Sequence, residues 1–306
     1  MAYPTPQVTK TTAATFIPEI WSDEVVAAYK KHLVAANLFK KMSFKGKKGD
    51  TVNIPSPTRG AASVKAASTA VTLIAATETN IPVLIDKHYE YSRFIEDIVE
   101  VQALSSLRRF YTDDAGYSLA KQIDTDMVQL GRTFNGGAAT AAYTGGYAGG
   151  DGTTAYVAGS NNQSALTDAA IRRTIQRLDD NDVPTDGRFF MIPPSARNTL
   201  MGLDRYTAMD FVGEAGNANT IRNGQIGNLY GMPVYVTSNC DTTSGSAAAR
   251  VALMGHKDAA VLVEQLGIRS QTQYKQDFLS TLYTSDTIYG VKELRDSSAF
   301  ALVVPA

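Results

Sequence analysis

Residues 56–80 read SPTRGAASVKAASTAVTLIAATETN, a run of small, β-prone residues with few large apolar side chains. Such a segment cannot bury a core of its own, because burial of apolar surface is what offsets the entropy lost on ordering the chain. The pattern changes on either side, where residues 51–54 and 81–91 alternate between apolar and polar as strands do. Two extended stretches around a small-residue tip predict one long hairpin. We expect this hairpin either to be mobile or to lie across a partner.

The strand that closes the hairpin, residues 81–91, has two different faces. One face is apolar, and the other carries Asp86, His88 and Glu90. Three such side chains could ligate a metal, but zinc sites usually need more nitrogen or sulfur ligands than one histidine supplies. We interpret them as the polar face of the hairpin base, and we predict no metal and no cofactor.

The next segment predicts the longest helix of the chain, from about residue 96 to residue 130. Apolar residues recur every three or four positions from Leu104 to Leu130. At about 1.5 Å per residue this helix would be roughly 45–50 Å long, which exceeds the diameter of a small domain. We therefore expect a strut along an elongated molecule.

Four aspartates lie along this helix and could suggest paired carboxylates for acid–base catalysis. They are Asp113, Asp114, Asp124 and Asp126. Because they are interspersed with the apolar stripe, we interpret them as the solvated face of the helix. The chain also lacks the motifs G-x-S-x-G, H-E-x-x-H and G-x-x-x-x-G-K-[ST], so nothing positive supports an enzyme.

The N-terminal region begins with residues 1–19, which are rich in Thr, Ala and Pro and show no periodicity. This composition predicts an arm that becomes ordered by docking onto something else. A helix is predicted from Ser22 to about Leu38, because Asp23 and Glu24 occupy its first turn and apolar residues follow at helical spacing.

The C-terminal half has the pattern of a mixed domain. Residues 131–160 are rich in glycine and predict a junction with an irregular loop. A helix is predicted to begin at Thr167, where Leu166 before the cap can pack on Ile171. The remaining elements are predicted as strands at 187–192, 250–255 and 267–273, short helices at 195–203 and 258–264, and a tail over 278–305 that returns to the sheet beside the long helix.

One glycine-containing stretch, IGNLYGMPVYVT at residues 226–237, raises the question of a phosphate cradle. A cradle of the dinucleotide kind needs a strand first, then the glycines, then a helix N-terminus. Here Gly227 and Gly231 come first and a strand follows, with Pro233 tolerated as its first residue. We interpret the stretch as a turn that leads into a strand.

Composition argues against several classes of protein. The chain has 306 residues and a formal net charge of −1, which argues against strong nonspecific attraction to nucleic acid or to an anionic membrane. Only 19% of its residues are charged, which hints that other subunits cover much of its surface. Cys240 is the single cysteine, so no intrachain disulfide forms. Because the N-terminus lacks the apolar region of a signal peptide and no segment approaches about 18 apolar residues, we expect a soluble intracellular product.

The order of these parts resembles that of the major capsid proteins of tailed bacteriophages, which have the HK97-type fold. The likeness spans residues 16–304 and rests on motifs that are weak one by one but specific in their order. The motifs are a loose N-terminal arm, KKGDTVNIPSP opening the hairpin, IPVLIDKHYEYSRFIEDIVEVQ closing it, the strut helix, IGNLYGMPVYVTSN, ALMGHKDAAVLVEQLGIRSQTQ and DTIYGVKELRDSSAFALVV.

The resemblance implies an α+β fold with four regions. These are an N-arm with the first helix at 1–47, an extended β-hairpin or E-loop at 48–85, a peripheral domain with one long spine helix at 86–133 and 278–306, and a mixed α/β axial domain at 134–277. The turn at Gly227, Gly231 and Pro233 would belong to the axial domain.

The resemblance also implies a structural, non-enzymatic function. Copies of the chain would form hexamers and pentamers that close an icosahedral shell around double-stranded phage DNA, with nonspecific contact to that DNA and no membrane. Because the chain starts almost directly at the arm, a separate scaffolding protein is expected, besides a portal and a possible decoration protein. Assembly would take place in the host cytoplasm and yield the virion capsid. An encapsulin-type nanocompartment, which encloses enzymes, is the alternative, and a nucleotide-dependent enzyme is a third reading.

Lysines crowd the segment before the hairpin, at residues 40–48. A surface that binds nucleic acid usually has aromatic residues between the basic ones, or a wider basic face. We instead expect these lysines to pair with the acidic run after the hairpin in an adjacent subunit. Exposed ion pairs of this kind contribute little binding free energy, so their main effect would be to fix the position of one subunit relative to the other. Some family members also form a Lys–Asn cross-link, but Lys65 has no matching partner motif, so no cross-link is predicted. The expected interface residues are Lys45, Lys47, Lys48, Arg59, Lys65, Glu96, Asp97 and Glu100.

Overall fold

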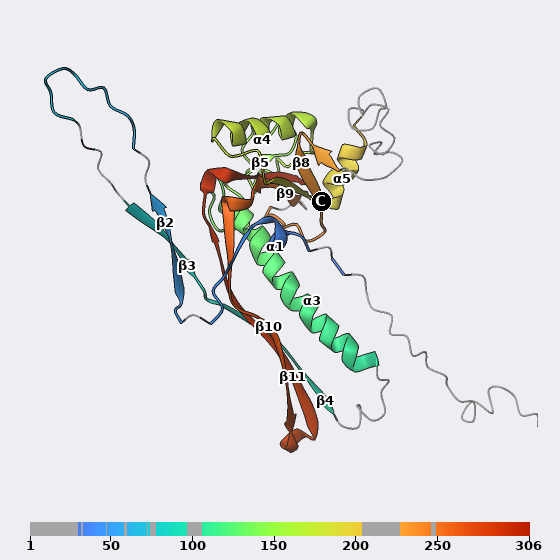
Figure 1. The fold of residues 1–306 in the computed structure, drawn as a ribbon. Helices are drawn as coiled ribbons and strands as arrows, with labels where there is room; N and C mark the ends of the chain where they lie inside the picture. The colour runs from blue at the N-terminus through green and yellow to red at the C-terminus, as the bar shows by residue number, and fades with distance from the viewer. Residues whose placement is uncertain are drawn as a thin grey trace, which may run out of the picture.

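The computed structural model describes residues 30–31, 33–46, 48–57, 60–71, 73, 78–96, 106–203, 227–245 and 249–306. In this part of the chain there are a four-stranded sheet, a six-stranded sheet and a two-stranded hairpin, and a long helix runs beside the first sheet (Figure 1). This combination of helices and sheets confirms the predicted α+β fold.

The four-stranded sheet is long and narrow and has the strand order β1-β10-β11-β4. β1 runs parallel to β10, whereas the other two neighbouring pairs are antiparallel. β1 pairs with β10 only as far as Glu264, so the far half of the sheet is three strands wide. The elements of this sheet are β1 (Lys40–Ser43), β4 (Lys87–Glu96), η3 (Lys257–Ala259), β10 (Ala260–Lys275), η4 (Gln276–Phe278) and β11 (Ser280–Glu293).

Strand β10 corrects the prediction of a short helix at residues 258–264. The segment is almost continuously apolar, and such a short run does not distinguish a buried strand from a buried helix. Ala260 and Leu262 belong to the main core of the molecule. Val261 and Val263 lie on the other face of the strand and pack with the base of the hairpin. Burial on both faces therefore explains the uninterrupted apolar run.

The long helix α3 (Ser106–Gln129) continues into the 3-10 turn η2 (Leu130–Arg132) and packs against β4, β10 and β11. Its buried face is the predicted apolar stripe, with Leu119 and Met127 almost fully buried. Its 24 residues form a rod about 36 Å long, shorter than predicted. The predicted start near residue 96 is wrong, because Glu96 is still paired with β11 as the last residue of β4.

The predicted N-terminal helix is only partly present. Residues 1–29 lie outside the described part of the chain, and helix α1 (Ala35–Leu38) begins only at Ala35. The described residues before it are not helical, so the prediction of one continuous helix is wrong there. Val34 and Phe39 on either side of α1 are buried in the main core, and this packing fixes the path of the chain.

The six-stranded sheet has the order β5-β12-β9-β6-β8-β7 and is covered on both faces. Phe189 and Met191 of β6 face the main core, whereas Phe190 and Ile192 face a second core beneath two helices. The predicted return of the C-terminal tail to the long sheet holds for β11 but not for β12, which lies between β5 and β9. The elements are β5 (Tyr147–Ala148), α4 (Asp168–Asp180), β6 (Arg188–Ile192), α5 (Pro194–Met201), β7 (Asn228–Leu229), β8 (Met232–Val236), β9 (Ala249–His256), η5 (Asp296–Ser298) and β12 (Ala299–Pro305).

Helix α4 begins where the sequence predicted. The hydroxyl oxygen of Thr167 accepts a hydrogen bond from the backbone N–H of Ala170, as an N-cap residue does. Leu166 and Ile171 are both fully buried in the second core, which confirms the predicted apolar contact across the helix start.

The glycine-rich segment 131–160 is irregular, as predicted, but it is packed. The ring of Tyr143 is fully buried, and the amide of Asn135 donates to the carbonyl oxygen of Gly145 and to the hydroxyl of Tyr147. A Cβ atom added to Gly145 would lie 2.3 Å from the carbonyl oxygen of Phe134. Glycine is therefore needed here for close packing of backbone on backbone.

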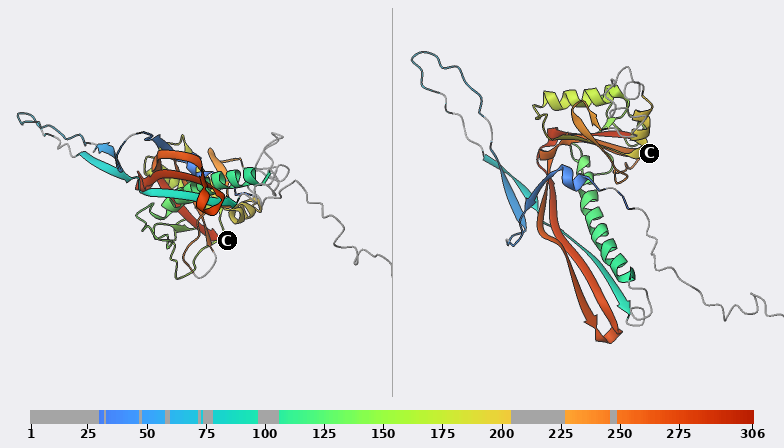
Figure 2. Two further views of the ribbon diagram at one scale, coloured as in Figure 1. Left: turned by 90° about the horizontal axis from the view of Figure 1, so that it is seen from below. Right: turned by 45° about the vertical axis from the view of Figure 1, so that its right-hand side comes forward.

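The hairpin consists of β2 (Thr51–Pro57) and β3 (Glu78–Leu84), paired antiparallel from Thr51↔Leu84 to Pro57↔Glu78. The strand is interrupted at residues 85–86, and the chain continues as β4 in the four-stranded sheet. The single strand predicted over 81–91 is therefore two strands. The views in Figures 1 and 2 agree that the hairpin projects away from the rest of the chain.

The turn between β7 and β8 shows why the stretch at 226–237 carries its second glycine. Tyr230 and Gly231 connect two antiparallel strands and both have positive φ, +50° and +80°. A two-residue hairpin turn of this kind favours glycine, because a Cβ atom is unfavourable at positive φ. The turn leads into a strand, which confirms the interpretation of this stretch as a turn before a strand.

Gly231→Ala is expected to lower the free energy of unfolding by about 1 kcal/mol, because alanine is disfavoured at this φ. Gly227→Ala is the matched control. At both glycines a Cβ atom would meet no other atom within 4 Å, but only Gly231 has a positive φ. Urea denaturation of the two full-length variants measures the difference. Equal losses in both would contradict the conformational explanation.

Candidate assembly surfaces

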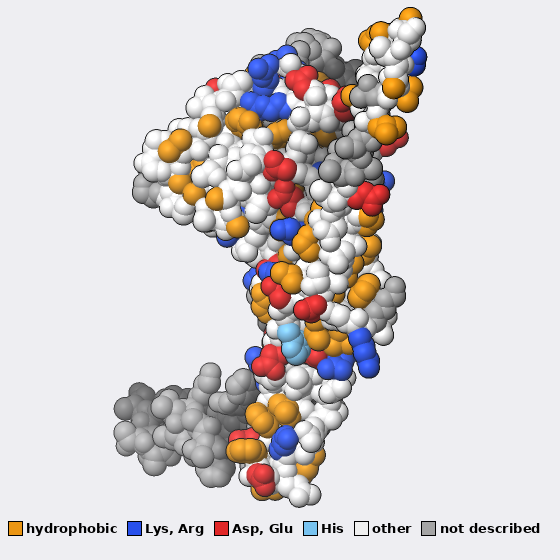
Figure 3. Space-filling model, turned by 90° about the vertical axis from the view of Figure 1, so that its left-hand side faces the viewer, with side chains coloured by type: hydrophobic (Ala, Val, Ile, Leu, Met, Phe, Trp, Pro, Cys, Tyr) orange, Lys and Arg blue, Asp and Glu red, His pale blue; other side chains and the backbone are white. Residues whose placement is uncertain are grey.

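The tip of the hairpin exposes apolar side chains that nothing in the described chain covers. Val64 is 98% exposed, Val71 65% and Leu73 88%. Figure 3 views the molecule from the side on which the hairpin projects, and apolar side chains lie uncovered along it. Scattered exposed apolar residues are ordinary, but here they gather on one projecting element that has no core beneath it.

The base of the hairpin is fixed to the long sheet. Val52, Val83 and Ile85 form a small buried cluster with two valines of β10. A Cβ atom at Gly290 would lie 2.1 Å from the carbonyl oxygen of Leu84, so the hairpin base approaches β11 as closely as a glycine allows. The hairpin is therefore anchored at one end and uncovered at the other.

The hairpin itself is a two-stranded ribbon. Its two strands are joined by backbone pairing and by polar contacts such as Asn80 Nδ2 to Asn53 Oδ1 at 3.0 Å. In the described part of the chain no third strand joins it and little apolar surface is buried along it, and an isolated ribbon of this kind is at best marginally stable in water. We therefore expect the ribbon to pack on the surface of another molecule.

A second exposed apolar group lies at the far end of the four-stranded sheet, around η4. The rings of Phe94 and Phe278 are 5.7 Å apart and are 54% and 69% exposed. Leu279 beside them is 66% exposed and has a positive φ of 44°. This end of the sheet is a second candidate contact surface.

The predicted interface charges are described only in part. Lys45, Lys48 and Glu96 are exposed, and Lys65 is exposed near the hairpin tip. The other four, Lys47, Arg59, Asp97 and Glu100, lie outside the described residues.

The described charges lie at opposite ends of the long sheet. Lys45 follows β1, whose last residue pairs with Glu264, whereas Glu96 pairs with Ser280 opposite Lys275. The stretch of β10 between these two points is about 35 Å long at about 3.3 Å per residue. Lys45 and Glu96 therefore do not meet within one chain, and a pairing between them requires two copies.

The interpretation of all four helix aspartates as solvated is wrong for Asp124 and Asp126, which are 0% and 5% exposed. Asp126 accepts hydrogen bonds from Lys87 Nζ at 2.9 Å and from the Tyr289 hydroxyl at 2.7 Å. Burial, reinforced by the Asp126 carboxylate, raises the pKa of Tyr289. Asp124 accepts from the backbone N–H of Ala36 at 3.1 Å and from the Asn239 amide at 2.8 Å. Asp126 thus connects α3 to β4 and β11 through hydrogen bonds, and Asp124 connects α3 to α1.

His88 and Glu90 lie on the exposed face of β4, as predicted, whereas Asp86 lies in the break before this strand. His88 also has a partner that was not predicted. The guanidinium of Arg269 donates to both carboxylate oxygens of Asp286, at 2.7 and 2.9 Å, and His88 Nε2 lies 3.3 Å from the same carboxylate. Arg269 is the main cause of the lowered pKa of Asp286. Asp86 and Glu90 are exposed and do not join this cluster. Among the described residues, no three His, Cys, Asp or Glu side chains group as metal ligands.

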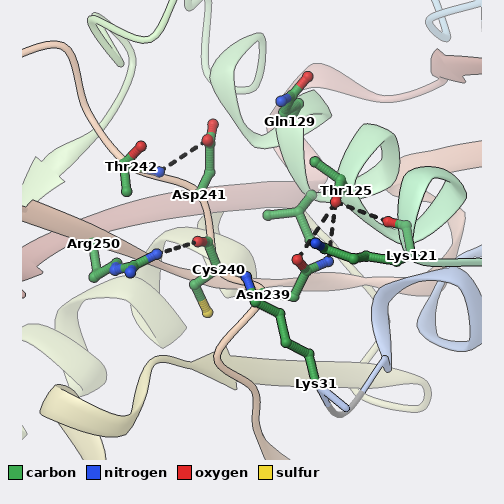
Figure 4. Close-up of a pocket in the computed structure, with 10 residues that line it drawn as sticks. Lys31, Lys121, Thr125, Gln129, Asn239, Cys240, Asp241, Thr242 and Arg250 are labelled. Atoms are coloured by element: carbon green, nitrogen blue, oxygen red, sulfur yellow. Dashed lines mark hydrogen bonds between the residues drawn. The ribbon is translucent and has the colours of Figure 1, made fainter. Parts of the chain in front are cut away.

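A cavity of about 220 Å³ lies between α3, the loop at residues 239–242 and the segment that precedes α1 (Figure 4). Its lining residues are far apart in the sequence, which is why no motif revealed them. They include Lys31, Lys121 and Arg250, together with Thr125, Val128, Gln129, Asn239, Cys240, Asp241 and Thr242. In the described part of the chain no helix is both long and apolar enough to cross a membrane.

Comparison with known proteins gives one family and a consistent fold. The model of a family described as phage capsid protein matches residues 93–301. A chain from Mycobacterium phage Che8 is similar with a TM-score of 0.73 and 25% identity, over 94% of this chain and 97% of that chain. The capsid structure of cyanophage P-SCSP1u gives a TM-score of 0.75 and 18% identity, over 96% and 94%. The mature capsid of bacteriophage PhiM1 gives 0.70 and 14%, over 94% and 92%. None of the curated proteins matches the sequence.

Proposed function

The chain belongs to the phage capsid protein family, and from this we propose that its copies assemble as hexamers and pentamers around double-stranded DNA. It is a major capsid protein with the HK97-type fold, and its copies associate in the icosahedral shell of a bacteriophage. It is therefore a structural component of the virion. That it catalyses no reaction is part of the proposal.

The observation that best supports assembly through the hairpin is its exposed tip on an anchored base. Covering the tip with the body of a neighbouring copy would bury the three exposed aliphatic residues and stabilise the ribbon. Burial of each such side chain contributes about 2 kcal/mol. Repeated around a capsomer, this contact would join each subunit to the next, so that folding of the hairpin is completed by assembly.

We propose the division into N-arm, E-loop, peripheral domain and axial domain with two changes of boundary. Drawing the boundary along the sheets would assign β10 to the peripheral domain, because it pairs with β11 there. The same rule would assign β12 to the axial domain, because it pairs with β9. The turn at Gly227, Gly231 and Pro233 would then lie in the axial domain, as expected.

Pairing between the basic segment and the acidic end of β4 remains our proposal for the contact between neighbouring subunits. Lys45→Glu combined with Lys48→Glu is expected to reduce the yield of shells, because like charges then face each other across the contact. Adding Glu96→Lys is expected to restore part of the yield. Particle yield in sedimentation and electron microscopy measures both effects. Normal shells from the double variant would contradict the pairing.

The proposed partners besides sister copies are a separate scaffolding protein, a portal, a possible decoration protein and the packaged DNA, which would be contacted without sequence preference. Assembly would take place in the host cytoplasm. The test is to express the chain together with its scaffolding protein and to image the product. Closed shells with hexamers and pentamers, and DNA in particles from infected cells, are expected. Particles filled with a protein cargo, or a chain that stays monomeric, would overturn the proposal.

A further inference from the structure

The cavity beside α3 brings together positive side chains from three separate segments of the chain. Lys31 comes from the segment before α1, Lys121 from α3 and Arg250 from β9. Figure 4 shows the amino groups of Lys31 and Lys121 pointing toward Asn239 from one side, and Arg250 approaching from the other. None of the three has a carboxylate partner among the described residues; Arg250 donates only to the backbone carbonyl of Cys240, at 3.1 Å.

The carboxylates near the cavity are already in use. Asp241 is bound by Arg132, whose Nε and NH2 groups donate to it at 2.7 and 3.1 Å, and it also accepts from Tyr143. Asp124 is fully buried behind Asn239, whose amide donates to it. Burial raises the pKa of the Cys240 thiol to about 12, so the thiol adds no negative charge near pH 7.

The charges around the cavity do not balance. The cavity and its immediate surroundings contain four cations and two carboxylates, which leaves an excess of two positive charges. The cations are Lys31, Lys121, Arg132 and Arg250, and the carboxylates are Asp124 and Asp241. Like charges held around one space repel one another, and this repulsion is relieved when an anion binds between them. A metal cation is excluded from the same space by the same field.

The size of the cavity and its donors identify the class of anion. A volume of about 220 Å³ has room for a small oxyanion and bound water. Besides the cationic groups, Gln129 and Thr242 line the space and supply neutral hydrogen-bonding groups. Free phosphate carries roughly one to two negative charges near pH 7 and a DNA backbone phosphate carries about one, so either offsets part or all of the excess, and the phosphate oxygens accept from donors on several sides. We propose that this cavity binds a phosphate group, supplied either by free phosphate or by the DNA backbone.

Binding at this position would link three parts of the chain. One phosphate would connect the segment before α1 to the middle of α3 and to the start of β9. In the described residues of the segment before α1, the backbone N–H of Lys31 donates to the Tyr117 hydroxyl at 2.8 Å and Lys30 Nζ donates to the carbonyl oxygen of Asp113 at 3.4 Å. The bound anion would therefore stabilise the path of the N-terminal segment against the strut helix.

The test measures inorganic phosphate binding to intact shells and to full-length subunits, by calorimetry at constant ionic strength set with chloride. Wild-type protein is expected to bind phosphate and to unfold at a higher temperature in its presence. Lys121→Gln combined with Arg250→Gln is expected to weaken binding about tenfold or more, because two charge-assisted contacts are lost. Arg173→Gln, an exposed arginine on α4, is the control for loss of charge and should bind like the wild type.

Lys31→Gln alone is the second variant, because this residue is exposed and its replacement should leave folding intact. It too is expected to weaken phosphate binding. Equal affinity in all variants, or no binding to the wild type, would overturn the proposal. Competition by a short DNA duplex would identify the DNA backbone as the source, and its absence would identify free phosphate. Shell formation, scored in the same samples by electron microscopy, separates this result from the assembly proposal.

Discussion

Replacing residues 58–77 by Asn-Gly is expected to give a chain that folds but no longer assembles into shells. The register of the hairpin permits the change, because Pro57 pairs with Glu78 and a two-residue turn can join them. The variant keeps both strands and the buried base at Val52 and Val83. It loses only the tip, whose described residues, 60–71 and 73, are all exposed.

The expected size of this effect follows from the apolar surface of the tip. In the proposed contact, each of the three exposed aliphatic side chains would contribute about 2 kcal/mol when a neighbouring copy covers it, and the variant loses all three. Because every subunit would make this contact, the loss would multiply around the shell. Electron microscopy and sedimentation should show particles for the wild type and dissociated subunits for the variant, while circular dichroism stays the same.

A finer variant separates the apolar contact from the length of the hairpin. Val64→Ser, Val71→Ser and Leu73→Ser together keep the length and remove the apolar groups, and shell yield is expected to fall here too. Val157→Ser is the control, because Val157 is 55% exposed but lies outside the hairpin. If the shortened chain still formed normal shells, the tip of the hairpin would have no part in assembly.

The hairpin could be predicted from the sequence because its signal is local. A segment poor in large apolar residues cannot offset the entropy of its own ordering, and this is visible in composition alone. The start of α4 was predictable for the same reason, since Thr167, Leu166 and Ile171 are close together in the chain.

The features that sequence patterns missed depend on pairing between distant segments. The start of α3 was placed too early because residues 87–96 are held as a strand by β11, almost 200 residues later in the chain. The helix predicted at 258–264 failed because burial on both faces of a strand removes the alternation that identifies it. The cavity combines Lys31, Lys121 and Arg250, and no local spacing reveals such a set.

The buried aspartates of α3 show the same limit most clearly. A helix face with carboxylates spaced among apolar residues usually faces water. Asp126 is buried instead because Lys87 and Tyr289, from two strands, supply the donors that replace water. A single sequence contains nothing that assigns these donors to it.

Asp126→Asn is expected to lower the free energy of unfolding by about 2 kcal/mol, because it removes the charge of a buried carboxylate and leaves the Lys87 ammonium, whose side chain is 30% exposed, without its ion-pair partner. The Tyr289 hydroxyl, now facing an amide, loses a charged acceptor in the same place. The consequence extends beyond local stability, since Asp126 joins α3 to both β4 and β11. Loss of these bonds is expected to let the strut helix move relative to the sheet that carries the hairpin.

Asp113→Asn is the matched control on an exposed turn of the same helix and should change the free energy of unfolding by less than about 0.5 kcal/mol. Urea denaturation of full-length subunits, kept below the concentration at which they assemble, measures both changes. Equal small changes in the two variants would mean that the Asp126 cluster contributes nothing to holding the strut.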